Sequence, residues 1–390
     1  MRRRRHLKTT GIITMKLHIA DTSIAVRGTE STRRAVNTFP SLLTLSNREV
    51  LLAYRVGSTK DSDDEIVEIR RSTDAGRSWG EPIVPFPNDM HGVRGSQKLA
   101  YLTELPGERL LAATMWVNRA VHPGKPLFNA KTEGCLPMAI VIFESTDGGR
   151  SWGAGRQVPM PASVGPPSLT APLLRLSDGR LAMSIESNKH YDDTLPWLQF
   201  VSYFHSADNG RHWMGPTVVA QDPTGRIFNW DQRAGVAPDG RIASFTWTYD
   251  STTKKYVNIH RRISADGGVS WSVPEDLGIA DQAGRPAILP DGRVVLPWVD
   301  RFVSHSIRVR AARGIDAPLE AGTELELYRL ETAAKQESST TSTGDLLADM
   351  GLWTFGLPFA ERMPDGDVLV AYYAGAAARM DIHVARLQVS

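Results

Sequence analysis

Apolar and polar positions along this chain fall into short runs that are typical of β-strands. The clearest pattern is a pair of apolar runs joined by a tight polar turn, and in four copies that turn contains Asp-Gly. Two apolar runs joined in this way predict a β-hairpin. The pattern occurs six times, at residues 45–55, 105–116, 176–186, 237–247, 289–300 and 363–375.

A second motif, S-x-D-x-G-x-x-W, recurs in phase with the hairpins. It occurs four times without a mismatch, at residues 72–79, 145–152, 206–213 and 264–271. Its Asp accepts hydrogen bonds from N–H groups of its own turn, and its Gly adopts a conformation that a side chain would penalise. The motif lacks the spaced carboxylates and final Glu of an EF-hand calcium loop, so a structural turn between two strands is the favoured interpretation.

Each repeated unit therefore predicts four strands, two from the hairpin and two around the motif. Six such units predict an all-β chain folded as a six-bladed β-propeller. The blades are expected at about residues 38–85, 96–160, 168–220, 230–277, 285–330 and 355–390. The last unit is one strand short, so we expect an early strand at 16–20 to complete it and close the ring.

Residues 15–390 are then expected to form one propeller domain, preceded by a disordered leader at 1–14. The basic run Arg2 to Arg5 could be a nucleic-acid arm or a targeting element, but extra leader sequence is favoured because Met15 begins the first plausible strand directly. The fifth unit lacks a clean copy of the motif, and the polar stretch 331–345 that follows predicts a flexible loop.

Composition narrows the possible partners and compartment. The chain is 41% hydrophobic and 23% charged with a formal net charge of +2, which is globular and indicates no nucleic-acid partner. It contains neither a signal-peptide apolar run nor a stretch approaching a membrane span, so cytoplasmic residence without a membrane partner is expected. The single cysteine, Cys135, excludes an intramolecular disulfide and a cysteine-cluster metal site, and we expect no metal and no cofactor.

The motifs in phase with Asp-Gly hairpins resemble the sialidase superfamily, also called BNR or Asp-box repeat proteins. The resemblance covers about residues 15–390 and implies a sialidase-like propeller. It also implies an exo-α-sialidase-like site, which uses a Tyr nucleophile assisted by Glu, an Asp acid/base and three arginines that bind the substrate carboxylate.

Several family positions carry other residues here. Thr38 stands where the first arginine is expected, so the arginine triad is incomplete. Glu186 stands near the place of a second arginine, and Arg285 is a candidate for the third. No tyrosine opens the last unit, where Trp353 and Phe355 are the nearest aromatic residues.

Carboxyl groups and arginines remain at the other positions. The loop after the first hairpin offers Asp61, Asp63 and Asp64 for the acid/base, and the place of the family Glu is filled by Thr170 in one unit and Asp231 in the next. The catalytic candidates are Asp63, Asp64, Glu186 and Asp231. The substrate-binding candidates are Arg55, Arg94, Trp230, Arg233, Tyr249, Arg285, Arg301 and Trp353.

Two classes of function follow. The first is a sialidase-like exo-glycosidase, a glycoside hydrolase acting on a terminal acidic sugar, because the arginines favour an acidic group. A polysaccharide lyase is a variant of it. The second is a non-catalytic propeller that binds carbohydrate or protein, with Asp231 and Arg233 as a structural ion pair and Trp230 and Trp247 as packing residues. A carbohydrate is the expected partner under every one of these hypotheses except a propeller that binds protein.

Overall fold

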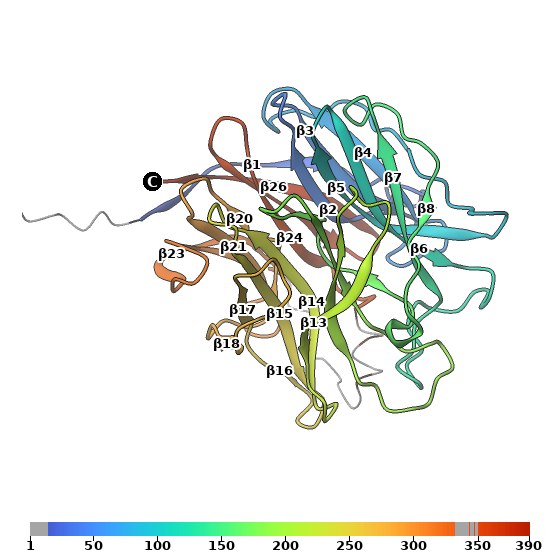
Figure 1. Cartoon of the computed structure of the whole chain (residues 1–390). Helices are drawn as coiled ribbons and strands as arrows, with labels where there is room; N and C mark the ends of the chain where they lie inside the picture. Colours follow the sequence, from blue (N-terminus) through green and yellow to red (C-terminus); the bar gives the residue numbers. More distant parts are fainter. Residues whose placement is uncertain (1–14, 332–342, 344–346, 348–349) are drawn as a thin grey trace, which may run out of the picture.

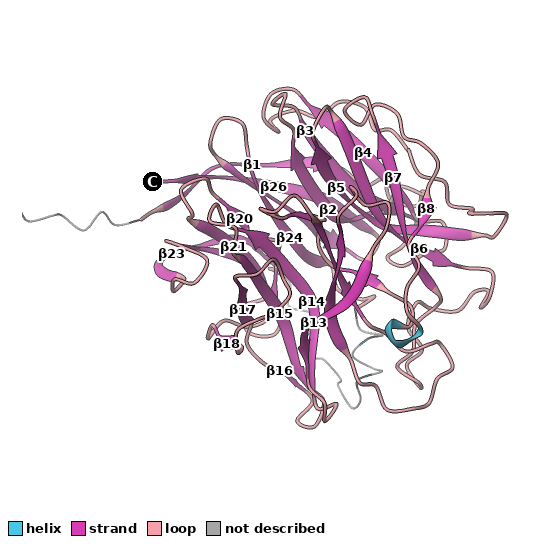
Figure 2. Ribbon diagram, in the orientation of Figure 1, coloured by secondary structure: helices cyan, strands magenta, loops and turns pink. Residues whose placement is uncertain are grey.

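The chain folds almost entirely into β-strands, as the repeated hairpins predict. The computed structural model describes residues 15–331, 343, 347 and 350–390, in which a short 3-10 helix, η1 (Ala162–Val164), interrupts the strands (Figure 2). The expected leader and nearly all of the expected polar loop lie outside the described residues. No helix in the described part of the chain is long and apolar enough to cross a membrane.

The largest of the five sheets joins the two ends of the chain. Its strands are ordered β24 (Phe355–Arg362), β25 (Val368–Ala376), β26 (Arg379–Val389), β2 (Val36–Thr44), β3 (Val50–Gly57) and β4 (Ile66–Ser72), with β1 (Leu17–Val26) also on β26. A single parallel pair, Val36 with Met380, connects β26 to β2, so two antiparallel groups make up this sheet.

Strand β1 runs antiparallel to β26, beside the C-terminal end of the chain (Figure 1). The register extends from Leu17 opposite Val389 to Val26 opposite Ile382. An N-terminal strand therefore pairs with the C-terminal strand, in the segment where the sequence predicts an early strand. It also covers an edge of β26 that would otherwise expose unpaired N–H and C=O groups.

The other four sheets each come from one continuous stretch of chain. One contains β5 (Gly95–Leu105), β6 (Arg109–Asn118), β7 (Met138–Ser145) and β8 (Arg156–Gln157). The next contains β9 (Ser168–Leu169), β10 (Leu174–Arg175), β11 (Leu181–Glu186), β12 (Phe200–Ser206) and β13 (Met214–Gln221). The third contains β14 (Ile227–Val236), β15 (Ile242–Asp250), β16 (Lys255–Tyr256), β17 (His260–Ser264) and β18 (Glu275–Asp276). The fourth contains β19 (Gln282–Ala283), β20 (Ala287–Ile288), β21 (Val294–Asp300), β22 (Ser306–Ala312) and β23 (Glu320–Arg329).

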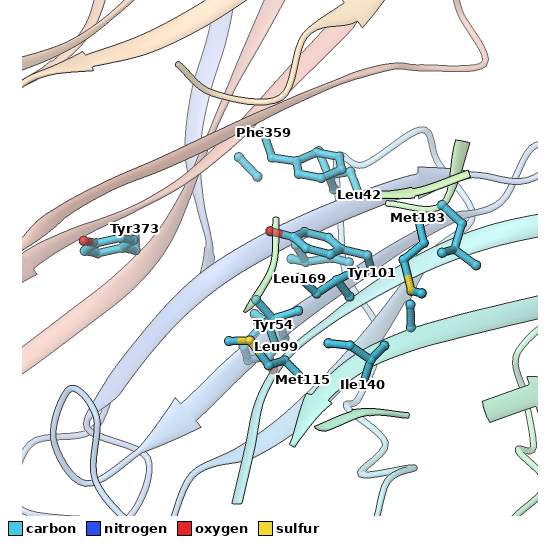
Figure 3. Close-up of a cluster of buried hydrophobic side chains, with 14 of the residues drawn as sticks. Leu42, Tyr54, Leu99, Tyr101, Met115, Ile140, Leu169, Met183, Phe359 and Tyr373 are labelled. Atoms are coloured by element: carbon cyan, nitrogen blue, oxygen red, sulfur yellow. The ribbon is translucent and has the colours of Figure 1, made fainter. Parts of the chain in front are cut away.

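All six predicted hairpins are present as antiparallel pairs. Their second strands are mostly buried, and β3 and β15 are buried at every position. A strand reads this way when both faces of its sheet are covered by other sheets. Figure 3 shows one core of this kind, in which Leu42, Tyr101, Leu169, Met183 and Phe359 meet from different strands.

The four S-x-D-x-G-x-x-W motifs form the same turn. In the first, the Ser72 hydroxyl donates to Asp74 Oδ1 (2.7 Å) and accepts from the Gly76 N–H (2.8 Å). Asp74 Oδ1 also accepts from the Ser78 N–H (2.9 Å), and the other three copies repeat these bonds. The predicted turn is therefore confirmed in all four copies. Three of them join two strands, whereas the first follows β4 and leads only to an isolated bridge between Ile83 and Ile69.

These turns predict a loss of stability in acid. Slight burial raises the pKa of Asp74, but hydrogen bonds from Ser78 outweigh it and lower the pKa to about 2. A carboxyl whose pKa is lowered by folding stabilises the fold above its unfolded pKa and loses that contribution as pH falls. We expect Asp74→Asn to lower Tm at pH 5 but hardly at pH 2, in thermal unfolding followed by circular dichroism. A difference from wild type that stays constant over this range, as expected for exposed Asp89→Asn, would contradict the prediction.

Candidate functional site

The first strands of several hairpins are interrupted at comparable places. The pairing of β2, β5, β14 and β24 with its partner strand shifts register once, and β9–β10 and β19–β20 are short strands separated by gaps. Phe39, Asp231 and Leu357 lie in these shifts with positive φ values of 51°, 49° and 48°. Bulges of this kind redirect side chains near functional sites. Here they direct Phe39, Lys98, Asp231 and Leu357 into one cavity.

The cavity has a volume of about 150 Å³ and combines charged, aromatic and aliphatic walls. Its charged residues are Lys60, Asp61, Lys98, Glu186, Asp231, Arg233 and Arg301. Its aromatic residues are Phe39, Tyr101, Phe128, Trp197, Trp230, Trp247, Trp353 and Tyr373. A mostly apolar pocket with a few converging polar groups is the usual form of a small-molecule site.

Glu186 and Asp231 form the acidic wall. Glu186 ends β11 and is 8% exposed, and its Oε2 accepts a hydrogen bond from the Asp231 N–H (2.8 Å). Burial raises the pKa of Glu186 to about 8, with the nearby Asp231 charge also raising it and the Asp231 N–H and Arg233 lowering it. Glu186 is therefore a carboxyl group that carries its proton at neutral pH.

The Asp231 carboxylate is held on both oxygens. Arg233 Nη2 lies 2.6 Å from Oδ1, and Gln282 Nε2 donates to Oδ2. Arg233 also donates to the Tyr101 hydroxyl (2.7 Å) and to the Thr170 carbonyl, so β5 and the segment between β9 and β10 fix its guanidinium. Burial lowers the pKa of Arg233, but Asp231 outweighs this and raises it.

A second buried ion pair supports Gln282 from behind. Asp281 is fully buried, and its Oδ2 lies 3.2 Å from Arg301 Nη1. Arg301 Nη2 donates to Gln282 Oε1 (2.5 Å), which leaves the amide nitrogen of Gln282 directed at Asp231. Burial raises the pKa of Asp281 to about 6, although Arg301 lowers it. A series of hydrogen bonds therefore links Asp281 to Asp231 through the Arg301 guanidinium and the Gln282 amide.

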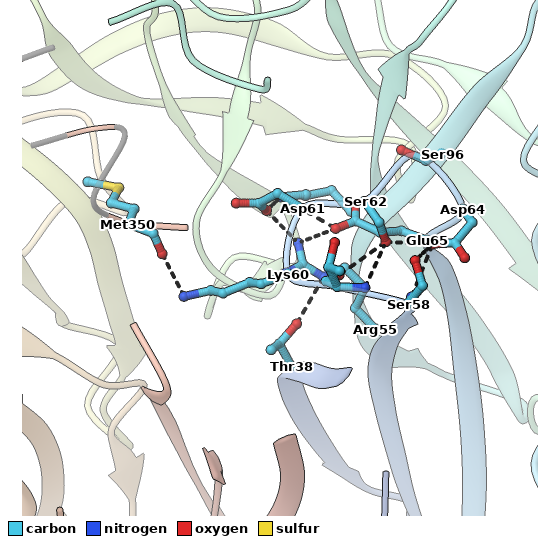
Figure 4. A network of polar contacts seen from close by, with 12 residues as sticks. Thr38, Arg55, Ser58, Lys60, Asp61, Ser62, Asp64, Glu65, Ser96 and Met350 are labelled. Atoms are coloured by element: carbon cyan, nitrogen blue, oxygen red, sulfur yellow. Dashed lines mark hydrogen bonds and ion pairs between the residues drawn. The ribbon is translucent and has the colours of Figure 1, made fainter. Parts of the chain in front are cut away.

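A cluster of opposite charges lies on the β3–β4 side of the cavity (Figure 4). Arg55 Nη1 lies 3.3 Å from Asp61 Oδ1 and 3.2 Å from Glu65 Oε1, and its Nε donates to Thr38 (2.9 Å). Lys98 contacts Asp61 as well. Burial raises the pKa of Glu65 to about 7, against the lowering by Arg55 and Arg119. This cluster holds Asp61 at the cavity edge.

Lys60 occupies a different part of the same wall. Its ammonium donates to the carbonyls of Met350 (2.6 Å) and Trp353 (2.9 Å) and to the Tyr373 hydroxyl (3.0 Å). Burial lowers the pKa of Lys60, Tyr373 raises it, and the charges of Arg301 and Arg55 lower it. Among the described residues, no carboxylate lies within ion-pair distance of this ammonium.

Tryptophans from several elements form the aromatic wall. Trp230 stacks with Tyr249 at a distance of 5.2 Å between ring centroids, and Trp247 stacks with Tyr256 at 4.4 Å between centroids. The Arg301 guanidinium lies over the Trp353 ring at 4.1 Å and over Trp247 at 5.6 Å. Such rings offer both packing surface and faces on which a sugar ring could stack.

The structure brings together part of the predicted site. Of the predicted residues, Glu186, Trp230, Asp231, Arg233, Arg301 and Trp353 line the cavity. Arg55 and Tyr249 do not line the cavity. Each packs against a residue that does, Arg55 against Phe39 and Tyr249 against Trp230.

The other predicted residues face elsewhere. Arg94 and Asp63 form an exposed ion pair outside the cavity lining. Asp64 accepts from Ser58 and Ser62, and Arg285 pairs with Glu361 at a separate hollow. Of the three neighbouring aspartates, Asp61 alone lines the cavity.

Sequence reasoning missed Lys60, Lys98, Tyr101, Gln282 and Tyr373. Gln282 lies in the polar segment 281–285 just before a predicted hairpin, so its position was available as a signal. The other four stand in a loop or in strands where nothing in the sequence indicates a chemical role. In the described part of the chain, no group of three or more His, Cys, Asp or Glu side chains is placed to hold a metal ion.

Comparisons with known proteins relate the chain to solved structures. No protein-family model and no curated protein matches it. A Dyadobacter fermentans protein of unknown function is similar in structure, with a TM-score of 0.73, 20% identity and coverage of 96% of this chain and 99% of that one. The Ruminococcus gnavus intramolecular trans-sialidase, solved with oseltamivir carboxylate, has a TM-score of 0.65 and 12% identity, with coverage of 94% of this chain and 96% of that one. The leech intramolecular trans-sialidase has a TM-score of 0.63 and 14% identity, with coverage of 98% of this chain and 71% of that one. The chain therefore has a sialidase-like fold.

Proposed function

We propose that this protein is a sialidase-like exo-glycosidase that hydrolyses the bond to a terminal acidic sugar, with Glu186 as the proton donor. The observation that carries the proposal is the pairing of a protonated carboxyl and a carboxylate in one cavity. Two carboxyl groups whose environments separate their protonation states are the usual acid and base of glycoside hydrolysis. The sialidase-like fold and the aromatic wall support a sugar as the ligand.

Glu186 has the geometry of a general acid. One of its oxygens accepts the Asp231 N–H, so the other is left to carry the proton towards the cavity. Protonation of the glycosidic oxygen makes the rest of the glycan a better leaving group, and positive charge then develops on the ring of the terminal sugar. The Asp231 carboxylate, fixed by Arg233 and Gln282, stabilises that charge.

Asp61 takes the second carboxyl role, for which the sequence offered Asp61, Asp63 and Asp64, with Asp63 and Asp64 as the chosen candidates. It reaches the cavity from the β3–β4 loop, whereas Glu186 and Asp231 come from two other sheets. Arg55 and Lys98 hold its side chain in place. In this scheme Asp61 accepts the proton of the attacking water.

The activity should be lost as pH rises. Glu186 must be protonated to act, and its pKa of about 8 places the acid form below that pH. We therefore expect kcat/KM to fall as pH rises through about 8, because this ratio reports the ionisation of the free enzyme. A pH–rate profile between pH 4 and 10 measures it. A basic limb near pH 5, the range of an ordinary glutamate, would contradict the assignment.

We also propose that the described strands form six blades of one propeller domain, spanning 15–390. The six hairpins and the division of the largest sheet at the Val36–Met380 pair support six separate groups of strands. The pairing of β1 with β26 supports closure between the chain ends.

A glycoside panel tests the proposed function. The panel contains uronides, 2-keto sugar acid glycosides and neutral glycosides, and product release is followed by reducing-sugar assay and ultraviolet absorbance. Saturated sugar acid released by wild type but not by Asp231→Ala supports hydrolysis. An unsaturated product selects a lyase instead. Binding measured by calorimetry without turnover of any member selects a non-catalytic carbohydrate-binding protein.

A further inference from the structure

We infer that Lys60 and Tyr373, with Arg301 beside them, bind the carboxylate of the substrate sugar. The inference deepens the proposed function, because it rests on a sugar acid being the ligand. The arginine positions expected from the family resemblance are incomplete, with Thr38 at the first of them. The acidic group therefore needs another partner, and Lys60, Tyr373 and Arg301 in the cavity lining provide one.

The first reason is that the Lys60 ammonium has no carboxylate partner among the described residues. The other cations of the cavity face carboxylates: Lys98 contacts Asp61, Arg233 contacts Asp231 and Arg301 contacts Asp281. The Lys60 ammonium is bound by three neutral oxygens instead. Lys60 is only partly exposed, and a charge held away from water without a counter-ion is costly, so an anionic ligand would be stabilised at this place.

The second reason is the direction of the Tyr373 hydroxyl. Its oxygen accepts the Lys60 hydrogen bond at 3.0 Å, which leaves its own O–H to donate elsewhere. A cation bound to the oxygen polarises the O–H and makes it a better donor to an anion. Tyr373 is buried, and its ring lines the cavity.

The third reason is the position of Arg301. A Cβ placed on Gly356 would lie 2.8 Å from Arg301 Nη2 and 3.0 Å from Tyr373 Oη, so both polar groups face the same point. Arg301 Nε has no hydrogen-bond partner among the described residues. Gly356 has a φ of 155°, and a side chain there would fill the space between the two groups. A carboxylate near Tyr373 would therefore have a lysine and an arginine close by.

Equilibrium binding tests the inference without relying on turnover. Calorimetry with D-glucuronic acid, N-acetylneuraminic acid and glucose is applied to wild type, Lys60→Met, Tyr373→Phe and the exposed control Lys125→Met. We expect at least one acid to bind wild type and the control, and to bind both site variants about tenfold or more weakly, as for loss of a charged hydrogen bond. Any glucose affinity should be the same in all four proteins.

The two acids distinguish the source of the carboxylate. Glucuronic acid carries it on C5, on the other side of the ring oxygen from the anomeric carbon, whereas N-acetylneuraminic acid carries it on the anomeric carbon. Tyr373→Phe keeps both Lys60 bonds to main-chain carbonyls, so it separates binding from a structural tie. Unchanged acid affinity in Tyr373→Phe, or no binding of either acid to wild type, would overturn the inference. Acid binding that depends on Tyr373, without hydrolysis of any glycoside, would leave it standing while the proposed function fails.

Discussion

Replacing Glu186 with glutamine is expected to lower kcat for glycoside hydrolysis by about 10²- to 10⁴-fold, the usual contribution of a general acid. Glutamine has nearly the same shape and still accepts the Asp231 N–H, but its amide cannot release a proton to the leaving oxygen. The fold and the ligand contacts should be retained. Steady-state kinetics on the best glycoside of the panel measures the effect.

The leaving group provides a control for this prediction. The nitrophenolate of a nitrophenyl glycoside leaves without being protonated, so Glu186→Gln should slow cleavage of this substrate much less than cleavage of a natural linkage. Asp63→Asn serves as the matched variant, because Asp63 is half exposed and pairs with Arg94 outside the cavity. Equal losses on both substrates would show that Glu186 acts in binding or structure and not as an acid.

Replacing Trp247 with alanine is expected to lower the free energy of unfolding by about 3–5 kcal/mol, the usual range for a fully buried tryptophan. The Trp247 side chain is 1% exposed and contacts Tyr256, Trp230 and Trp353. Its removal leaves a cavity among rings that are too rigid to collapse into it. Urea unfolding followed by circular dichroism measures the difference.

An exposed apolar residue is the control for Trp247. Leu195 is 68% exposed, and Leu195→Ala should change the unfolding free energy by less than about 0.5 kcal/mol. Trp247→Phe, which keeps an aromatic ring in the cluster, should lose less than the alanine variant. A loss below about 1 kcal/mol in Trp247→Ala would mean that the aromatic cluster contributes little to the fold.

Local sequence predicted the elements of this fold well. Each hairpin depends on a turn of a few residues between two apolar runs, and each motif turn depends on bonds within Ser72 to Ser78 or its equivalents. These interactions lie within one short segment, so they can be predicted from the sequence. The pairing of β1 with β26 followed from a counting argument, because the last unit lacked a strand.

The site was predicted less completely, because side-chain direction depends on the tertiary structure. Asp61, Asp63 and Asp64 are nearly adjacent, yet a positive φ of 65° at Asp61 helps to separate their directions. Asp61 meets Lys98 at the cavity, whereas Asp63 meets Arg94 near solvent. Partners so far apart in sequence are chosen by the packing of whole strands, and no local pattern records that choice.

The sequence by itself determined the all-β class, the six hairpins, the four motif turns and the presence of acidic and aromatic residues at hairpin starts. The tertiary structure alone decided which of those residues share a cavity and what surrounds them. Register shifts in β2, β5, β14 and β24 direct single residues inward. Their surroundings then set their protonation and charge. Burial raises the pKa of Glu186, and the neighbours of Lys60 among the described residues include no counter-ion. Both effects arise from groups distant in sequence that close around the same space.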